Sequence, residues 1–152
     1  GFNGDNACTF PCGKVDIEAQ RLMDVTKESL HRGIAAAVAG NRVGDIGHAV
    51  QSYVEENGFS VVRSFVGHGV GKELHEDPEV PNYGHAGHGV RLVNGMTIAI
   101  EPMVNQKHHS VKTLSDGWTV VTADGGLAAH FEHSVAILPG GPEILTIGWE
   151  EP

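Results

Sequence analysis

The sequence predicts an α+β fold in one domain, with two helices followed by a sheet-rich second half. Two observations predict it: apolar residues recur at helical spacing in the first third, and β-branched and aromatic runs follow. The chain has 152 residues, of which 40% are hydrophobic, enough to bury a core of its own. No repeat or low-complexity tract divides it, so we expect residues 1–152 to form a single domain.

The two helices are predicted from the spacing of their apolar side chains. One stripe runs through residues 14–38 and a second through residues 46–54. Gly40 and Asn41, which reach left-handed backbone conformations easily, separate the two, and Gly58 ends the second.

The strands are predicted from composition and from a change of period. Runs rich in β-branched and aromatic residues cover residues 59–66, 96–104, 118–122 and 131–138. Loops rich in glycine and histidine are expected between them, at residues 67–89 and 105–116.

Charge and cysteine content exclude several classes of partner. Ten Lys and Arg stand against nineteen Asp and Glu, a net charge of −9, so we expect no basic surface for nucleic acid. No apolar run approaches the roughly 20 residues that a membrane span needs. The two cysteines, Cys8 and Cys12, are too few and too close together for a disulfide framework. We therefore expect free thiols and a location in the reducing cytoplasm.

Two glutamates in predicted strands are candidates for metal ligation. Strand alternation places Glu101 on the face of Ala99, and Glu132 on the face of Ser134, so that both carboxylates stand beside small neighbours. A buried carboxylate is costly unless it is paired or binds a cation, and few Lys or Arg lie nearby in the sequence. The alternative is that both strands lie at a sheet edge, where the glutamates are solvated.

Two histidines are candidates for the same site. His68 lies between Gly67 and Gly69, where backbone can approach closely, and so could bind a metal. His75 lies in a segment that Pro78 constrains and could act on protons. The alternative for each is an exposed loop histidine.

Other hydrolytic and nucleotide-driven chemistries lack their motifs. The chain has no His-Glu-x-x-His helix motif, no Gly-x-Ser-x-Gly elbow and no phosphate-binding loop that ends in Lys-Ser/Thr.

Five segments together carry a resemblance to a known family. They are GFNGD at residues 1–5, FVGHGVGKELHEDP at 65–78, GMTIAIEPM at 95–103, DGW at 116–118 and FEH at 131–133. In order and spacing they closely resemble the type I methionine aminopeptidases, which belong to metallopeptidase family M24. The resemblance implies an incomplete pita-bread fold, with two helices followed by a mostly antiparallel curved sheet. On this resemblance, residues 1–152 are a single partial peptidase domain, namely the C-terminal portion of the pita-bread catalytic domain.

The resemblance also implies a dinuclear metal centre. Asp5, His68, Glu101 and Glu132 match four of the family's five ligands, and Asp5 and Glu132 match the two that bridge the ions. The fifth ligand, an aspartate, lies in the family just upstream of the position that matches Gly1. Such oxygen ligands with one imidazole suit two divalent ions of Co, Mn, Fe(II) or Zn.

The activity implied is removal of the initiator methionine by a hydroxide held between the two metal ions. Glu101 resembles the residue that takes the proton of the water, and His75 resembles the one that binds the scissile amide and stabilises the tetrahedral intermediate. Met103 and Trp118 match positions near the substrate side chain. Leu74 departs from the family, whose members often have an aromatic residue there.

The resemblance further implies a cytoplasmic enzyme that acts on the N-terminal methionine of nascent polypeptides. It implies a monomer at full length, with no nucleic acid or membrane partner, and leaves contact with the ribosome open. Two rival functions remain: an Xaa-Pro aminopeptidase-like hydrolase, and a non-catalytic pita-bread binding module. We expect the 152 residues alone to bind metal weakly and to be weakly active or inactive, because one cation lacks its main carboxylate and a sheet edge is left unpartnered.

Overall fold

The structure is a computed structural model that describes residues 1–148. Within these residues two helices and eleven strands follow one another, with one short strand before the helices. In chain order they are β1 (Asn6–Ala7), α1 (Ile17–Ala36), α2 (Val43–Glu56), β2 (Ser60–Val61), β3 (Gly67–Gly69), β4 (Glu76–Val80), β5 (Thr97–Ile100), β6 (Met103–Asn105), β7 (Val111–Thr113), β8 (Val120–Thr122), β9 (Ala128–His130), β10 (Glu132–Leu138) and β11 (Gly141–Ile144).

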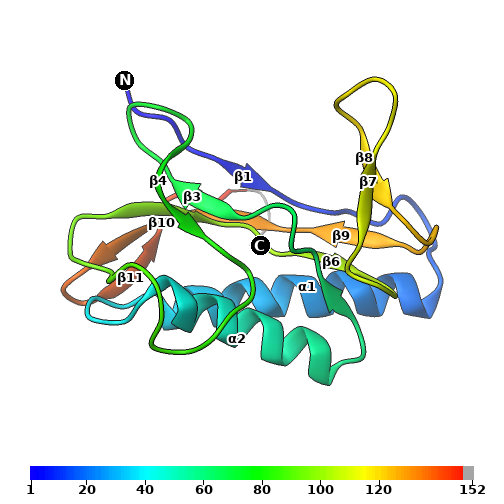
Figure 1. Ribbon diagram of the computed structural model, residues 1–152, viewed down its shortest axis with the longest axis horizontal. Helices are drawn as coiled ribbons and strands as arrows, with labels where there is room; N and C mark the ends of the chain where they lie inside the picture. Colours follow the sequence, from blue (N-terminus) through cyan, green and yellow to red (C-terminus); the bar gives the residue numbers. More distant parts are fainter. Residues whose placement is uncertain (149–152) are drawn as a thin grey trace.

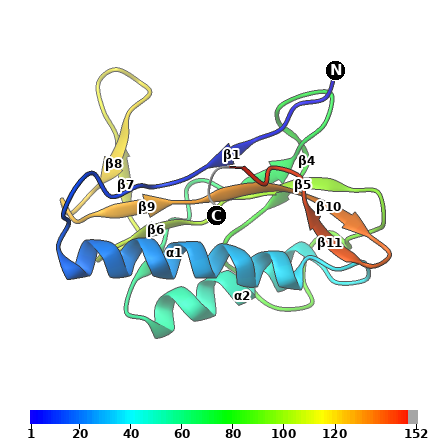
Figure 2. The same ribbon diagram turned by 180° about the vertical axis from the view of Figure 1, so that it is seen from behind.

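The strands form three antiparallel sheets in the described part of the chain. The largest has the order β1-β10-β5-β3-β4, with β11 also paired to β10, and the others are β2-β6-β9 and the hairpin β7-β8. Both helices lie on one side of these sheets, and the β7-β8 hairpin projects on the other side (Figure 1). The view from behind in Figure 2 shows the same two layers. The predicted α+β fold is therefore confirmed.

The helices form where the apolar periodicity predicts them. The side chain of Asp16 caps α1 by accepting a hydrogen bond from the Ala19 backbone N–H at 2.8 Å. The two helices pack closely at Gly33, where an added Cβ would lie 2.8 Å from a methyl group of Val50. No helix of residues 1–148 has the length and apolar character needed to cross a bilayer.

Two predicted strands form the middle of the largest sheet. The run at 131–138 becomes β10, while the run at 96–104 divides into β5 and β6 around Glu101 and Pro102. Because β10 and β5 each have neighbours on both sides, the alternative that both strands lie at a sheet edge is wrong.

Other parts of the strand prediction are also wrong. The loop expected at 67–89 contains β3 and β4, the loop expected at 105–116 contains β7, and only Ser60–Val61 of the run at 59–66 is a strand. The glycine-rich composition favours a loop at Gly67–Gly69. The structure instead has a strand there, because β3 can pair with its neighbours only if Gly67 and Gly69 have no side chain. A Cβ on Gly67 would lie 2.2 Å from the carbonyl oxygen of Ala99 on the neighbouring strand.

The two faces of β10 have different roles. Val135 and Ile137, together with Phe131 just before the strand, belong to the hydrophobic core, to which both helices contribute. Strand alternation turns Glu132 and Ser134 to the opposite face, away from the helices. The carboxylates predicted as metal ligands thus lie on the side of the sheet that the helices leave uncovered.

Candidate metal centre

Four residues predicted as ligands come together on neighbouring strands. Asp5 directly precedes β1, His68 is on β3, Glu101 follows β5 and Glu132 begins β10. These strands occupy adjacent positions in the order β1-β10-β5-β3, so the sheet brings residues up to 127 positions apart into one cluster.

Pairing of β1 with β10 fixes Asp5 beside Glu132. The Asp5 backbone N–H donates to Ser134 Oγ at 2.8 Å, and the same hydroxyl donates to the Asp5 carbonyl oxygen at 2.8 Å. Because Ser134 lies two residues after Glu132 on one face of the strand, this exchange holds the Asp5 backbone at the cluster.

The imidazole of His68 is oriented with Nε2 toward the carboxylates. Its Nδ1 lies 2.9 Å from the Gly69 carbonyl oxygen, which can only accept, so Nδ1 carries the hydrogen and donates. In the neutral ring Nε2 then has a lone pair, and it lies 3.5 Å from Glu101 Oε1 and 3.8 Å from Asp5 Oδ2. A hydrogen bond at one ring nitrogen that orients the other is the usual arrangement for a metal-binding histidine.

Glu132 is the residue that most needs a cation. It is 5% exposed, and Oε1 has no hydrogen-bond partner among the described residues. Burial, followed by the negative charges of Glu101 and Asp5, raises the pKa of this carboxyl from 4.5 to about 8. A divalent ion would replace the lost solvation and offset the repulsion among the three carboxylates, so the residues present fit a metal.

Glu101 lies between β5 and β6, and the Asn82 side-chain amide donates to the Glu101 backbone carbonyl oxygen at 3.1 Å. Its side chain is 14% exposed. The carboxylate is therefore held by a fixed backbone and is shielded from solvent, as a ligand or a proton acceptor in the cluster would be.

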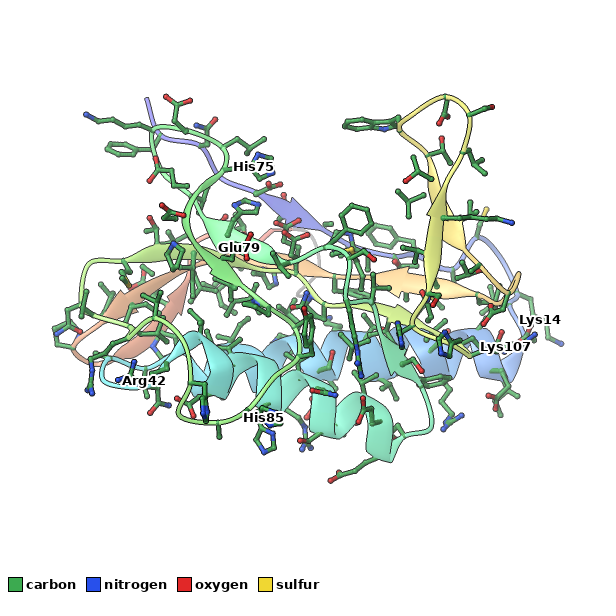
Figure 3. All side chains as sticks on the ribbon, in the orientation of Figure 1. Lys14, Arg42, His75, Glu79, His85 and Lys107 are labelled. Carbon is green, nitrogen blue, oxygen red and sulfur yellow. The ribbon has the colours of Figure 1, made fainter. Side chains whose placement is uncertain are left out.

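His75 lies next to the cluster on its exposed side. The His75 and His68 ring centroids are 4.3 Å apart, and His75 itself is exposed. Figure 3 shows His75 on the side of the sheet away from the helices, whereas His85 lies on the helix side. His75 is thus placed to meet a molecule that approaches the cluster from solvent.

The two residues expected near a substrate side chain are placed differently. Met103 lines a mainly apolar cavity of about 390 Å³, which His130 borders next to the cluster. Trp118 is 88% exposed near the tip of the β7-β8 hairpin, where its backbone N–H donates to Asp116 Oδ1 at 3.0 Å. The structure does not bring Trp118 to the cluster or to this cavity. Leu74 is also exposed.

One residue of the cluster, His130, is not among those predicted from the sequence. Its Nε2 lies 3.6 Å from Glu101 Oε2 and 4.0 Å from Glu132 Oε2. A signal existed, because His130 precedes Glu132 by two residues in an extended segment and so shares its face.

The candidate ligands form two overlapping groups in the described residues. Asp5, His68 and Glu132 form one, and Glu101, His130 and Glu132 form the other, with the ligand atoms of each group within 4.8 Å of one another. Glu132 is common to both groups.

An antiparallel sheet with two helices on one side (Figure 1) and a carboxylate–histidine cluster on the other is the arrangement that the pita-bread metallopeptidase resemblance predicts. The sequence model of metallopeptidase family M24 matches residues 1–139, and the chain belongs to this family. The family relation supports the requirement for divalent metal that the cluster itself indicates.

Curated relatives and solved structures show which members of the family this chain is similar to. It is 59% identical over 147 residues to a methionine aminopeptidase of Clostridium perfringens and 53% identical over 146 residues to methionine aminopeptidase 1 of Bacillus subtilis. The matches cover 97% and 96% of this chain, and 59% of each relative. The chain thus spans about three fifths of the length of these relatives.

The crystal structure of a Thermotoga maritima methionine aminopeptidase superposes with a TM-score of 0.95 at 50% identity, over 97% of this chain and 59% of that one. A prolidase of Pyrococcus furiosus reaches a TM-score of 0.75 at 23% identity, over 97% of this chain and 38% of that one. The second likeness shows a shared fold alone, and together the two confirm the predicted pita-bread architecture.

Proposed function

We propose that this chain carries the metal site of a methionine aminopeptidase, which removes the N-terminal methionine from new proteins. The observation that carries the proposal is the buried carboxylate of Glu132, whose Oε1 has no hydrogen-bond partner among the described residues and which Asp5, His68 and Glu101 surround. The names of the Clostridium perfringens and Bacillus subtilis relatives supply the substrate.

Two divalent ions of Co, Mn, Fe(II) or Zn are the proposed cofactors. Asp5, His68, Glu101 and Glu132 would hold them, with Asp5 and Glu132 shared between the two ions. The membership of Glu132 in both ligand groups supports its shared role. Bound there, such ions supply Lewis acidity, which polarises a peptide carbonyl and makes water a stronger nucleophile at neutral pH.

The residues of the chain have two further roles in this proposal. Glu101 accepts the proton of the attacking water, because its shielded carboxylate lies inside the cluster. His75 donates a hydrogen bond to the scissile amide and to the oxygen that becomes negative during attack, because it lies beside His68 on the exposed side.

The apolar cavity beside the cluster gives room for a substrate side chain. Its volume is about 390 Å³, and Met103 and Phe65 are among its apolar lining residues. We propose that Met103 contacts substrate there. Trp118 would take part only if the β7-β8 hairpin moved toward the substrate, since it is 88% exposed as the structure stands.

The remaining parts of the proposal rest on the relatives. The chain is proposed to be a partial peptidase domain, supported by its match to 59% of the relatives' length. N-terminal methionine of nascent polypeptides in the cytoplasm is the proposed substrate, with contact with the ribosome left open.

Peptide specificity tests the proposal against the two rival functions. We expect Met-Ala-Ser to be hydrolysed at least about 100-fold faster than Ala-Pro-Ser, in the presence of Co(II) or Mn(II), because methionine fills the apolar cavity. The assay compares this chain with a longer version that also carries the part of the relatives outside the match.

The outcomes separate the functions. Preference for Ala-Pro-Ser would identify an Xaa-Pro hydrolase. No hydrolysis by either version, together with no metal binding, would identify a binding module instead.

A further inference from the structure

The Nε2 atom of His130 faces the cluster and makes no hydrogen bond within the described residues. This nitrogen is buried, although 36% of the side chain is exposed. A buried imidazole nitrogen without a hydrogen bond costs free energy, and this one faces the carboxylates of Glu101 and Glu132, so it is placed to share a cation with them.

The carboxylate of Glu101 lies between two histidines. Glu101 Oε1 is 3.5 Å from His68 Nε2, and Glu101 Oε2 is 3.6 Å from His130 Nε2. Two atoms bound to one ion at about 2.1 Å lie roughly 3–3.5 Å apart, so both separations are close to ligand spacing.

The backbone of His130 is held firmly on both sides. It pairs with Met103 on β6, and its N–H donates to Thr9 Oγ1 at 2.9 Å while the Thr9 hydroxyl donates to its carbonyl oxygen at 2.9 Å. These backbone contacts fix the position of the His130 Cα. The folded sheet therefore holds the imidazole close to Glu101 and Glu132.

We propose that His130 is a metal ligand that completes the half of the centre formed by Glu101 and Glu132. The centre then has two imidazoles, His68 and His130, one at each oxygen of the Glu101 carboxylate, in place of the single imidazole that the sequence predicts. This inference rests on the proposed metal site and goes beyond it by assigning a ligand that the family resemblance does not supply.

An added nitrogen ligand changes which metal the half-site prefers. Imidazole favours Co(II) and Zn(II), whereas Mn(II) prefers oxygen ligands. We therefore expect Co(II) to bind this half-site tightly relative to Mn(II), and the difference to depend on His130.

The test compares the wild-type chain with His130→Gln and with His88→Gln, which removes an exposed histidine from the loop at the N-terminal end of α2. Calorimetric titrations with Co(II) and with Mn(II) measure affinity and stoichiometry. Circular dichroism checks that each variant is folded. We expect His130→Gln to lose about 10-fold or more in Co(II) affinity at one site and about 3-fold or less for Mn(II), with His88→Gln unchanged.

A second measurement on the wild-type chain does not depend on the folding of a variant. On addition of Zn(II), the ring-nitrogen resonances of His130 should shift together with those of His68, while those of His88 stay in place. An unchanged ratio of Co(II) to Mn(II) affinity in a folded His130→Gln, or an unshifted His130 ring, would overturn the inference and leave the other ligands standing. If neither this chain nor the longer version binds either ion, the proposed metal site fails, and the inference with it.

Discussion

Replacing Glu132 with glutamine is expected to raise the melting temperature of the metal-free protein at alkaline pH. In the unfolded chain this carboxyl ionises near its ordinary pKa of 4.5, whereas burial and the charges of Glu101 and Asp5 raise the pKa in the folded protein to about 8. Between these pH values the folded state holds a proton that the unfolded state has released. Stability therefore falls as the pH rises from about 4.5 to about 8, and it stays lower above that.

Glutamine has no charge to lose, so Glu132→Gln removes this penalty. We expect a gain of about 2 kcal/mol or more at pH 9, or roughly 4–8 °C in melting temperature, and almost no gain at pH 4. Thermal unfolding with a chelator present, followed by circular dichroism at both pH values, measures the effect.

The matched control is Glu143→Gln, since Glu143 is an exposed carboxylate on β11. It should leave the melting temperature within about 1 °C of wild type at both pH values. The metal site is argued from the unfavourable burial of the ionised Glu132 carboxylate. A Glu132→Gln protein that is no more stable than wild type at pH 9 would contradict that destabilisation.

His75→Ala is expected to lower kcat for Met-Ala-Ser by about 100-fold or more, because it removes a donor to the developing negative charge. His75 is exposed and lies beside the cluster, and its removal should leave metal affinity and folding intact. The measurement uses the longer version of the protein, with kinetics and metal titration carried out on the same sample.

His85→Ala provides the comparison, because His85 lies on the helix side of the molecule (Figure 3). It should have wild-type kinetics. If His75→Ala also turns over normally, His75 has no part in the reaction.

The helices could be predicted because their stability depends on local pattern and caps. The stripe at 14–38 becomes Ile17–Ala36, and the stripe at 46–54 lies within Val43–Glu56. The strand Gly67–Gly69 could not be predicted in this way. Its pairing depends on close approach to Ala99 on another strand, and composition alone carries no information about such a neighbour.

The candidate site was predictable to the extent that single residues carried a signal. Glu101 and Glu132 stood out as carboxylates in apolar strands, and His68 as an imidazole between glycines. Asp5 carried no such signal and depended on the resemblance. His130 lies one residue before the predicted strand at 131–138, so the alternation of that strand does not by itself join His130 to Glu132.

The order of strands explains why the site needs the whole fold. Asp5 reaches Glu132 through pairing of β1 with β10, and His68 reaches Glu101 through pairing of β3 with β5. Neither contact is local in the sequence, so the cluster forms only when the sheet does. The carboxylates are thereby held close together against their mutual repulsion, and bound cations would stabilise the folded state.

Titration of this chain with Co(II), followed by calorimetry and by visible absorption, tests the central claim most directly. We expect weak but saturable binding in wild type and a loss of about 100-fold or more in affinity in Glu132→Gln, with Glu143→Gln unchanged, because Glu132 belongs to both ligand groups. Absence of saturable binding in both the folded wild-type chain and the longer version, or equal affinity in wild type and Glu132→Gln, would contradict a metal centre built on Asp5, His68, Glu101 and Glu132.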